Sequence, residues 1–168
     1  MQFEQFVGER QRALFRFAVV LCGDPVLAEE LVQNVLSRAF ERWPQVSAAQ
    51  DINAYVRRMV VNEFLGDKRR ARRTTPVAEI FDHQLPGSPD HAELQSDRAA
   101  LAAELAQLPR QQRAVLVLRY YAGLPFGEIA SSLGCREATA RAHAARALAA
   151  LRIRMASPDE VALSMGEP

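Results

Sequence analysis

The sequence predicts an all-α protein of two small helical domains joined by a flexible acidic linker; the second domain contains a helix-turn-helix. Apolar residues recur at three- and four-residue intervals over most of the chain, and no stretch alternates apolar and polar residues as a half-buried strand does. Glycines and prolines divide this pattern into segments of helix length. The chain has 168 residues, 49% of them hydrophobic, which is enough to build the cores of two small domains.

The first two helices are predicted by their periodicity and by the residues at their boundaries. Residues 3–21 follow the helical repeat, and Gly23 ends that helix because glycine readily adopts the left-handed conformation common at helix ends. Asp24 can cap the next helix by accepting a free backbone N–H. Pro25 suits its first position because proline has no N–H to leave unbonded. We expect this second helix to reach about Trp43.

Pro44 ends the second helix in this prediction, because a proline inside a helix removes a backbone hydrogen bond. A loop then spans Pro44 to Asp51. A third helix begins near Ile52 and continues toward the basic run KRRARR at residues 68–73. Residues 1–73 would form the first domain.

The second half of the chain reads as a second helical domain, residues 98–155. Before it, residues 74–97 contain three prolines, a glycine and no Lys or Arg, which is the composition of a linker. Four helices are expected in the second domain, at about residues 98–107, 110–122, 126–133 and 137–153. Residues 156–168 would form a short tail.

The run FGEIASSLGCREATARAHAARALAAL, residues 126–151, has the spacing of a helix-turn-helix, whose second helix enters the major groove of DNA. Gly134 would provide the turn, and Ile129 and Leu133 would pack the first helix. The residues expected near DNA lie on the second helix: Arg136, Glu137, Thr139, Ala140, Arg141, His143 and Arg146. An Ala-rich helical hairpin with arginines on its exposed face would give the same pattern without binding DNA.

Small residues occupy positions of this second helix where a larger aliphatic side chain is usual. They are Ala140, Ala144 and Ala145. The helix is therefore either weakly anchored or lies closer to its partner helix.

Charge is segregated along the chain although the net charge is only +1. Residues 1–73 carry 12 Lys/Arg against 9 Asp/Glu, and residues 98–155 carry 9 against 3. Residues 74–97 carry 5 acidic residues and no basic one, and the tail carries 3 acidic residues. Two basic blocks separated by an acidic spacer favour the binding of a polyanion such as nucleic acid by the blocks.

The stretch RRMVVNEFLGDKRRARR, residues 57–73, places basic residues on both sides of an apolar run. Basic and amide side chains on one helix can follow phosphates, and an aromatic residue beside them suits a strand with unstacked bases. The residues concerned are Tyr55, Arg57, Arg58, Asn62, Lys68, Arg69 and Arg70. A nuclear-type import signal, or a solvated helix end whose positive charge suits the helix dipole, would explain the same cluster.

No group of residues indicates catalysis, a cofactor or a metal site. Cys22 and Cys135 lie in unrelated contexts, and the three histidines are scattered. The N-terminus lacks the charged-then-apolar pattern of a signal peptide, and the longest apolar run, residues 17–22, is too short to cross a bilayer. We therefore expect a cytoplasmic protein that is not an enzyme, with no cofactor and no membrane insertion.

Four segments, taken in order, resemble the bacterial sigma-70 family, specifically its small two-domain extracytoplasmic-function group and the SigE-like actinobacterial branch. They are FEQFVGERQRALFRFAVVLCGD, AEELVQNVLSRAFERW, AYVRRMVVNEFLGDKRR and LPRQQRAVLVLRYYAGLPFGEIASSLGC. The resemblance implies that residues 1–73 bind core RNA polymerase and the promoter −10 element. It also implies that residues 98–155 bind the −35 element.

The resemblance carries roles onto individual residues. It implies that core polymerase is bound by Glu30, Leu31, Gln33, Asn34, Arg38 and Trp43. Asn34 stands where the family usually has an acid, so docking would lose one charge there. It implies that the non-template strand and a flipped base are held by the loop from Pro44 to Asp51 and by Asn53, Tyr55, Arg57, Arg58 and Asn62.

The implied partners are core RNA polymerase and promoter DNA, and sigma factors of this group are often held inactive by an anti-sigma factor. Two alternatives stay open on the sequence. The chain could be a stand-alone DNA-binding regulator that uses only the helix-turn-helix. It could also be a helical protein-interaction module whose basic faces meet an acidic partner, and salt-insensitive binding to a protein without binding to DNA would favour that alternative.

Overall fold

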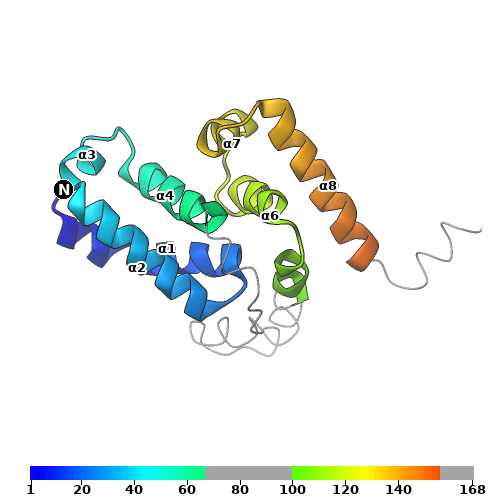
Figure 1. Cartoon of the computed structure of the whole chain (residues 1–168), viewed down its shortest axis with the longest axis horizontal. Helices are drawn as coiled ribbons and strands as arrows, with labels where there is room; N and C mark the ends of the chain where they lie inside the picture. Colours follow the sequence, from blue (N-terminus) through cyan, green and yellow to red (C-terminus); the bar gives the residue numbers. More distant parts are fainter. Residues whose placement is uncertain (67–99, 156–168) are drawn as a thin grey trace, which may run out of the picture.

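The computed structural model describes residues 1–66 and 100–155. Within these two ranges the chain is helical and contains no strand, as the sequence predicts. Figure 1 shows the N-terminal helices on the left and the C-terminal helices on the right, with α4 and α6 beside one another in the middle. The predicted linker, 74–97, and tail, 156–168, lie outside the described residues.

The first helix and the start of the second follow the prediction. Helix α1 (Phe3–Cys22) ends at Gly23, which has the left-handed φ of 69°. Helix α2 (Pro25–Glu41) begins after Asp24, whose carboxylate accepts hydrogen bonds from two backbone N–H groups of the first turn at 2.8 and 3.3 Å. Both boundaries follow from local chemistry, because glycine tolerates the left-handed conformation and aspartate satisfies orphan donors.

The prediction for residues 42–47 was wrong. Helix α2 ends at Glu41, and a separate short helix, α3 (Trp43–Ser47), follows a break at Arg42. Pro44 therefore lies in the first turn of α3 and does not end a helix; at that position its missing N–H breaks no intrahelical bond. Helix α4 (Ile52–Gly66) then begins where the sequence places it.

Aromatic side chains join α1 to the junction of α2 and α3. The ring of Phe3 lies 5.0 Å from that of Phe40 and 5.2 Å from that of Trp43, measured between centroids. The ring of Phe6 lies 5.5 Å from that of Trp43, whose Nε1–H also donates to the carbonyl of Met1 at 3.2 Å. Tilted and edge-on contacts of this kind add to the burial of apolar surface, so the cluster fixes α3 against α1.

The C-terminal half follows the predicted order of helices. Its elements are a helical segment at residues 100–106, α6 (Arg110–Leu116), the π-helical turn η3 (Val117–Tyr121), α7 (Phe126–Leu133) and α8 (Glu137–Met155). The helix expected at 110–122 thus changes from α to π geometry at Val117. A π turn shifts the register of the side chains; Val117 is buried, while Tyr120 and Tyr121 are exposed.

Alanines bring α8 close to the helices that it covers. Ala140, Ala144 and Ala147 are buried, whereas Ala145 is exposed. Of the two alternatives left by the sequence, close approach is the one observed, because small side chains allow two helix backbones to lie near each other.

The two halves are in contact, which the sequence did not predict. Helix α4 lies against α6, α1 lies against η3, and the buried apolar side chains of both halves form one continuous cluster. None of the described helices is long and apolar enough to cross a membrane.

Candidate nucleic-acid interface

The first half of α8 forms an exposed basic face. Gly134, with a φ of 64°, makes the turn between α7 and α8. The exposed side chains on the N-terminal part of α8 and just before it are Arg136, Glu137, Thr139, Arg141 and Arg146, and His143 is half-buried. Ala140 is a correction to the predicted DNA-facing set, because its side chain is 0% exposed and faces the protein interior.

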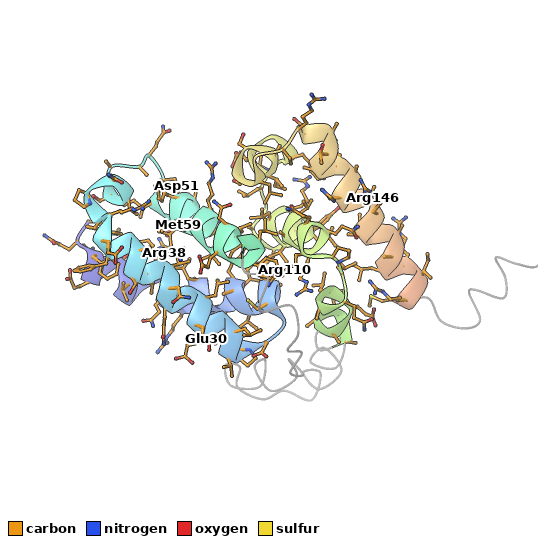
Figure 2. All side chains as sticks on the ribbon, viewed as in Figure 1. Glu30, Arg38, Asp51, Met59, Arg110 and Arg146 are labelled. Carbon is orange, nitrogen blue, oxygen red and sulfur yellow. The ribbon has the colours of Figure 1, made fainter. Side chains whose placement is uncertain are left out.

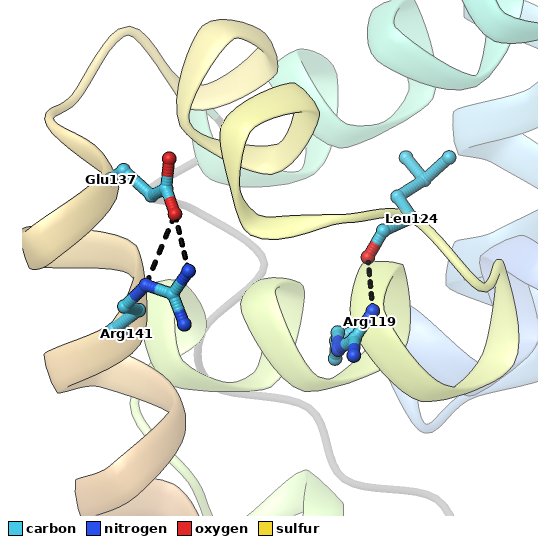
Figure 3. A network of polar contacts seen from close by, with 4 residues as sticks. All are labelled: Arg119, Leu124, Glu137 and Arg141. Atoms are coloured by element: carbon cyan, nitrogen blue, oxygen red, sulfur yellow. Dashed lines mark hydrogen bonds and ion pairs between the residues drawn. The ribbon is translucent and has the colours of Figure 1, made fainter.

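Arg141 is held against its own domain by two contacts, and Figure 3 shows the one with Glu137. Its Nε donates to the Glu137 carboxylate at 3.1 Å, and its guanidinium lies 4.8 Å from the centroid of the Phe126 ring. Arg119 shares that ring at 5.2 Å and donates to the carbonyl of Leu124 at 3.1 Å. Arg141 must leave this network before it can extend toward a base or a phosphate.

The residues of α4 that were predicted to bind the separated strand lie on two faces of the helix. Tyr55, Arg58 and Asn62 are exposed and lie three and four positions apart, so they share one helix face. Asn53 and Arg57 are half-buried, lie four positions apart and line a pocket that the other three do not line. Both faces belong to the predicted strand-binding set; Lys68, Arg69 and Arg70 lie outside the described residues.

Asn53 and Arg57 line a basic pocket of about 380 Å³, together with Arg10 and Arg16 of α1. The Nε atom of Arg57 is buried and has no hydrogen-bond partner. Asp51 is the acidic residue of the lining, and its carboxylate accepts the backbone N–H of Ala54 at 3.0 Å. We call this cavity the basic pocket; its surplus of guanidinium groups suits an anion such as a phosphate.

Helix α1 contributes residues to this pocket that were not predicted from the sequence. Arg10 and Arg16 are exposed residues on a helix whose other face is apolar, and that is the pattern of an ordinary solvated face. Only the packing of α1 against α4 brings them beside Arg57. Tyr121 and Ala122 of the C-terminal half also line the pocket, and this contribution was not predicted either.

Helix α2 carries four residues of the predicted polymerase-binding set at exposed positions, and Figure 2 labels two of them, Glu30 and Arg38. Glu30, Gln33, Asn34 and Arg38 are exposed at helical spacing. Leu31 is a correction, because its side chain is 0% exposed and belongs to the core. Arg38 forms an ion pair with Glu63 of α4, and Trp43 is half-buried in the aromatic cluster.

Arg113 is a functional candidate that the sequence did not reveal. Its side chain is 8% exposed, and its Nη1 donates to the carbonyls of Leu21 at 2.9 Å and Cys22 at 3.3 Å, at the end of α1. Its Nη2 donates to the carbonyls of Leu108, at 3.2 Å, and Ala106. Burial lowers the pKa of Arg113 through desolvation, and the four carbonyls compensate the buried charge.

A second cavity lies among the helices of the C-terminal half, with Val20 of α1 in its lining, and is almost wholly apolar. It measures about 550 Å³ and is lined by residues that include Val20, Leu101, Leu105, Val117, Tyr120 and Leu148. The described residues contain no group of three or more His, Cys, Asp or Glu side chains that could hold a metal ion.

Two family models match the chain, and together they cover most of it. "Sigma-70 region 2" matches residues 6–74 and "Sigma-70, region 4" matches residues 98–151. Among curated relatives, the RNA polymerase sigma-E factor of Streptomyces coelicolor is 36% identical over 95% of this chain and 89% of that protein. The ECF RNA polymerase sigma factor SigL of Mycobacterium tuberculosis is 32% identical over 88% of this chain and 85% of that protein.

Two solved structures share the fold. CnrH in complex with the cytosolic domain of CnrY has a TM-score of 0.64 at 21% identity, over 91% of this chain and 86% of that one. The sigma factor RpoE in complex with the anti-sigma factor NepR from Bartonella quintana has a TM-score of 0.65 at 23% identity, over 92% and 98%. With both regions matched and with relatives above 30% identity along most of the chain, this protein belongs to the sigma-70 family, in its extracytoplasmic-function group.

Proposed function

We propose that the two halves of this sigma factor divide promoter recognition, with residues 1–73 binding the −10 element and core RNA polymerase and residues 98–155 binding the −35 element. As a sigma factor the chain acts in transcription initiation. The single observation that carries the division is that one chain presents two separate basic surfaces, on α4 with the basic pocket and on α8. Residues 74–97 would connect them.

Helix α8 would read the −35 element in the major groove. Arg136, Arg141 and Arg146 are exposed on it, and arginine can bind guanine edges bidentately or hold phosphates. Glu137 and Thr139 are exposed among them, and His143 lies beside them half-buried. Ala140 would act only by allowing α8 to lie close to its own domain.

Helix α4 would hold the separated non-template strand. Tyr55 gives a partly exposed ring on which a base can stack, and Arg58 and Asn62 lie on the same face to hold the backbone. Asn53 and Arg57 would bind a phosphate or an extruded base in the basic pocket, because extrusion requires compensating contacts worth a few kcal/mol. Lys68, Arg69 and Arg70, which lie outside the described residues, would add positive charge for binding the strand.

The exposed face of α2 would bind core polymerase through Glu30, Gln33, Asn34 and Arg38. Charged residues on one face suit a complementary charged helix on a partner. Leu31 and Trp43 would support this face from beneath. The polymerase would perform the chemistry, and we propose no catalytic role, cofactor or metal for this chain; its place would be the cytoplasm, where polymerase acts.

Reconstituted transcription tests the proposal. The full chain is added to purified core polymerase, and run-off transcripts are measured on sheared genomic DNA. We expect new transcripts with the wild-type chain and their loss with Arg57→Ala. Arg136→Ala should raise the concentration of promoter DNA that transcription requires. A template that is already melted over the −10 region should rescue Arg57→Ala but not Arg136→Ala, since only the first change affects strand opening.

Failure to bind core polymerase would contradict this function and return the chain to the alternative of a stand-alone regulator. That alternative is not favoured, because the chain matches both sigma regions and not the helix-turn-helix alone. Its signature would be tight, salt-dependent binding of the full chain to a duplex site without polymerase.

We also propose that an anti-sigma factor controls this chain. Both similar solved structures are described as complexes, one of them with an anti-sigma factor by name. The apolar cavity of the C-terminal half, which Val20 of α1 also lines, offers a surface that the apolar face of an amphipathic helix could fill. Affinity purification of the tagged chain from its own cells, followed by identification of co-purified proteins, tests this, and a Val20→Glu variant that retains polymerase but loses the partner would locate it.

A further inference from the structure

We propose that the basic pocket binds a free nucleoside monophosphate, whose phosphate monoester contacts the arginines and whose base lies against Tyr121. The pocket is lined by residues of α1, of the start of α4 and of the end of η3. This ligand is a small molecule in solution and not a segment of DNA. The site goes beyond promoter binding, because Arg10 and Arg16 belong to none of the predicted DNA-binding sets.

The charge of the basic pocket matches a phosphate with two negative charges. Its lining has three guanidinium groups, those of Arg10, Arg16 and Arg57, and one carboxylate, that of Asp51. The Asp51 carboxylate is already engaged as an acceptor for the backbone N–H of Ala54, at 3.0 Å. A phosphate monoester carries a charge of about −1.5 to −2 at neutral pH, whereas a phosphodiester of a DNA backbone carries a single negative charge. The surplus of cations therefore favours a monoester over a diester.

Arg57 and Asn53 offer further donors to such an anion. The Nε of Arg57 is buried, and no acceptor for it is found among the described residues. A buried donor without an acceptor costs free energy, and an anionic oxygen would supply the acceptor. Asn53 has an amide that can donate, and it lies in the first turn of α4, where the helix dipole favours an anion.

Tyr121 gives the basic pocket an aromatic side. Its side chain is 52% exposed, and its ring centroid lies 6.2 Å from that of Phe17, which also lines the pocket. The contact with Phe17 orients the ring, while the exposed part remains accessible to a ligand. Bases stack on aromatic side chains whatever their identity. An aromatic ring beside three guanidinium groups fits a ligand that joins a base to a phosphate.

The size of the basic pocket fits one nucleotide. Its volume of about 380 Å³ lies near the lower end of the range for small-molecule sites, about 300–1,000 Å³. A ligand with one base, one sugar and one phosphate suits a site of this size. Because such a ligand would contact residues of three helical segments in the folded chain, its binding would stabilise the fold by mass action.

Isothermal titration calorimetry of the full chain with four probes tests the chemical class of the ligand. Adenosine 5′-monophosphate (AMP) has a base and a phosphate monoester, and cyclic AMP has the same base with a phosphodiester. Adenosine lacks the phosphate, and inorganic phosphate lacks the base. We expect AMP to bind with a Kd below about 1 mM and the other three probes to bind about tenfold more weakly or less.

Arg10→Ala tests the place of binding, and Arg12→Ala is its matched control. Both arginines are exposed on α1, but only Arg10 lines the basic pocket. The two substitutions therefore remove the same charge from the same helix. We expect Arg10→Ala to weaken AMP binding by about tenfold and Arg12→Ala to change it by less than about twofold. Arg57→Ala replaces Arg10→Ala if circular dichroism shows that Arg10→Ala does not fold.

Three results would overturn the proposal. The first is equal affinity for AMP and cyclic AMP, which would leave the pocket to the phosphodiesters of a DNA strand. The second is an equal loss of AMP binding in the pocket variant and in Arg12→Ala, and the third is the absence of AMP binding to the wild-type chain. None of these titrations involves polymerase or promoter DNA, so their failure leaves the proposed function intact. Conversely, a chain that binds AMP but never directs transcription loses only the proposed function.

Discussion

Asp24 fixes the start of α2 by a local interaction that the sequence makes visible. Its side chain is 2% exposed, and its carboxylate accepts the backbone N–H groups of Val26 and Leu27. Pro25, the next residue, has no backbone N–H and therefore adds no further donor that needs an acceptor. Because Asp24 is buried between α1 and α2, the cap also sets the angle at which the chain turns.

The first prediction is that Asp24→Ala lowers the free energy of unfolding by about 1–2 kcal/mol, since two backbone N–H groups, one of them in a buried hydrogen bond, lose their acceptor. Asp24→Asn, which keeps an acceptor oxygen, should lose less than half of that. Urea denaturation followed by the fluorescence of Trp43, the single tryptophan of the chain, measures both. Equal losses for the two variants would contradict a capping role.

Asn34 stands at a position where the resemblance to the sigma-70 family implies an acid. It is exposed on the α2 face together with Glu30 and Arg38, so substitution there should not disturb the core. An acid at this position would restore one charge to the proposed polymerase-binding face.

The second prediction is that Asn34→Asp tightens binding to core polymerase by roughly threefold to tenfold, and that the gain shrinks as salt is raised. Ser37→Asp, one turn along the same helix and also exposed, is the control for adding a negative charge to α2. Competition for core polymerase against a labelled wild-type chain gives the ratio. A gain that survives high salt would indicate a cause other than the restored charge.

At the scale of elements, α8 is positioned by small residues. Ala140, Ala144 and Ala147 face the interior, and Leu151 anchors the far end. The polar residues of the proposed recognition surface are therefore held by close backbone packing and not by large apolar side chains. An ion pair between Arg154 and Glu104, at 3.0 Å, adds a contact to the helix at 100–106.

The third prediction is that Ala144→Leu destabilises the chain by about 1–3 kcal/mol, because a larger side chain cannot enter the space at that contact without moving α8. Its neighbour Ala145 is exposed, so Ala145→Leu should change stability by less than about 0.5 kcal/mol. Thermal unfolding followed by circular dichroism compares the two. Similar values for both variants would mean that α8 lies less closely packed than described.

At the scale of the whole molecule, Arg113 makes the stability of one half depend on the other. It is buried, it has acceptors in both halves, and its guanidinium lies over Phe64. A buried charge of this kind destabilises the protein unless its hydrogen bonds are complete. Four carbonyls accept from its two Nη atoms, while its buried Nε has no hydrogen-bond partner.

The fourth prediction is that Arg113→Met lowers the free energy of unfolding by about 1–3 kcal/mol, because the loss of charged hydrogen bonds outweighs the relief of desolvation. Arg152→Met, at an exposed position, should change it by less than about 0.5 kcal/mol. Guanidinium denaturation gives both values. An unchanged free energy of unfolding in Arg113→Met would show that the hydrogen bonds from Arg113 to the carbonyls of Leu21 and Cys22 do not stabilise the protein.

Local chemistry explains why most elements could be predicted from the sequence. Gly23, Asp24 and Gly134 act on their immediate neighbours, so the ends of α1 and α7 and the start of α2 were found correctly. The boundary at Pro44 was missed because proline is compatible both with the end of a helix and with the first turn of another. The aromatic contacts that select the second outcome come from α1, far away in the sequence.

The sequence by itself determined the helical class, the helix-turn-helix, the segregation of charge and the resemblance to the sigma-70 family, because these depend on residue order and on short-range spacing. Only the tertiary structure decided which members of each predicted site are exposed. It buried Leu31 and Ala140, joined Arg10 and Arg16 to Arg57, and placed Arg113 at the end of α1. The physical reason is that periodicity identifies an apolar face but not the distant element that covers it. Contacts between residues as far apart as 92 positions arise only when the helices pack together.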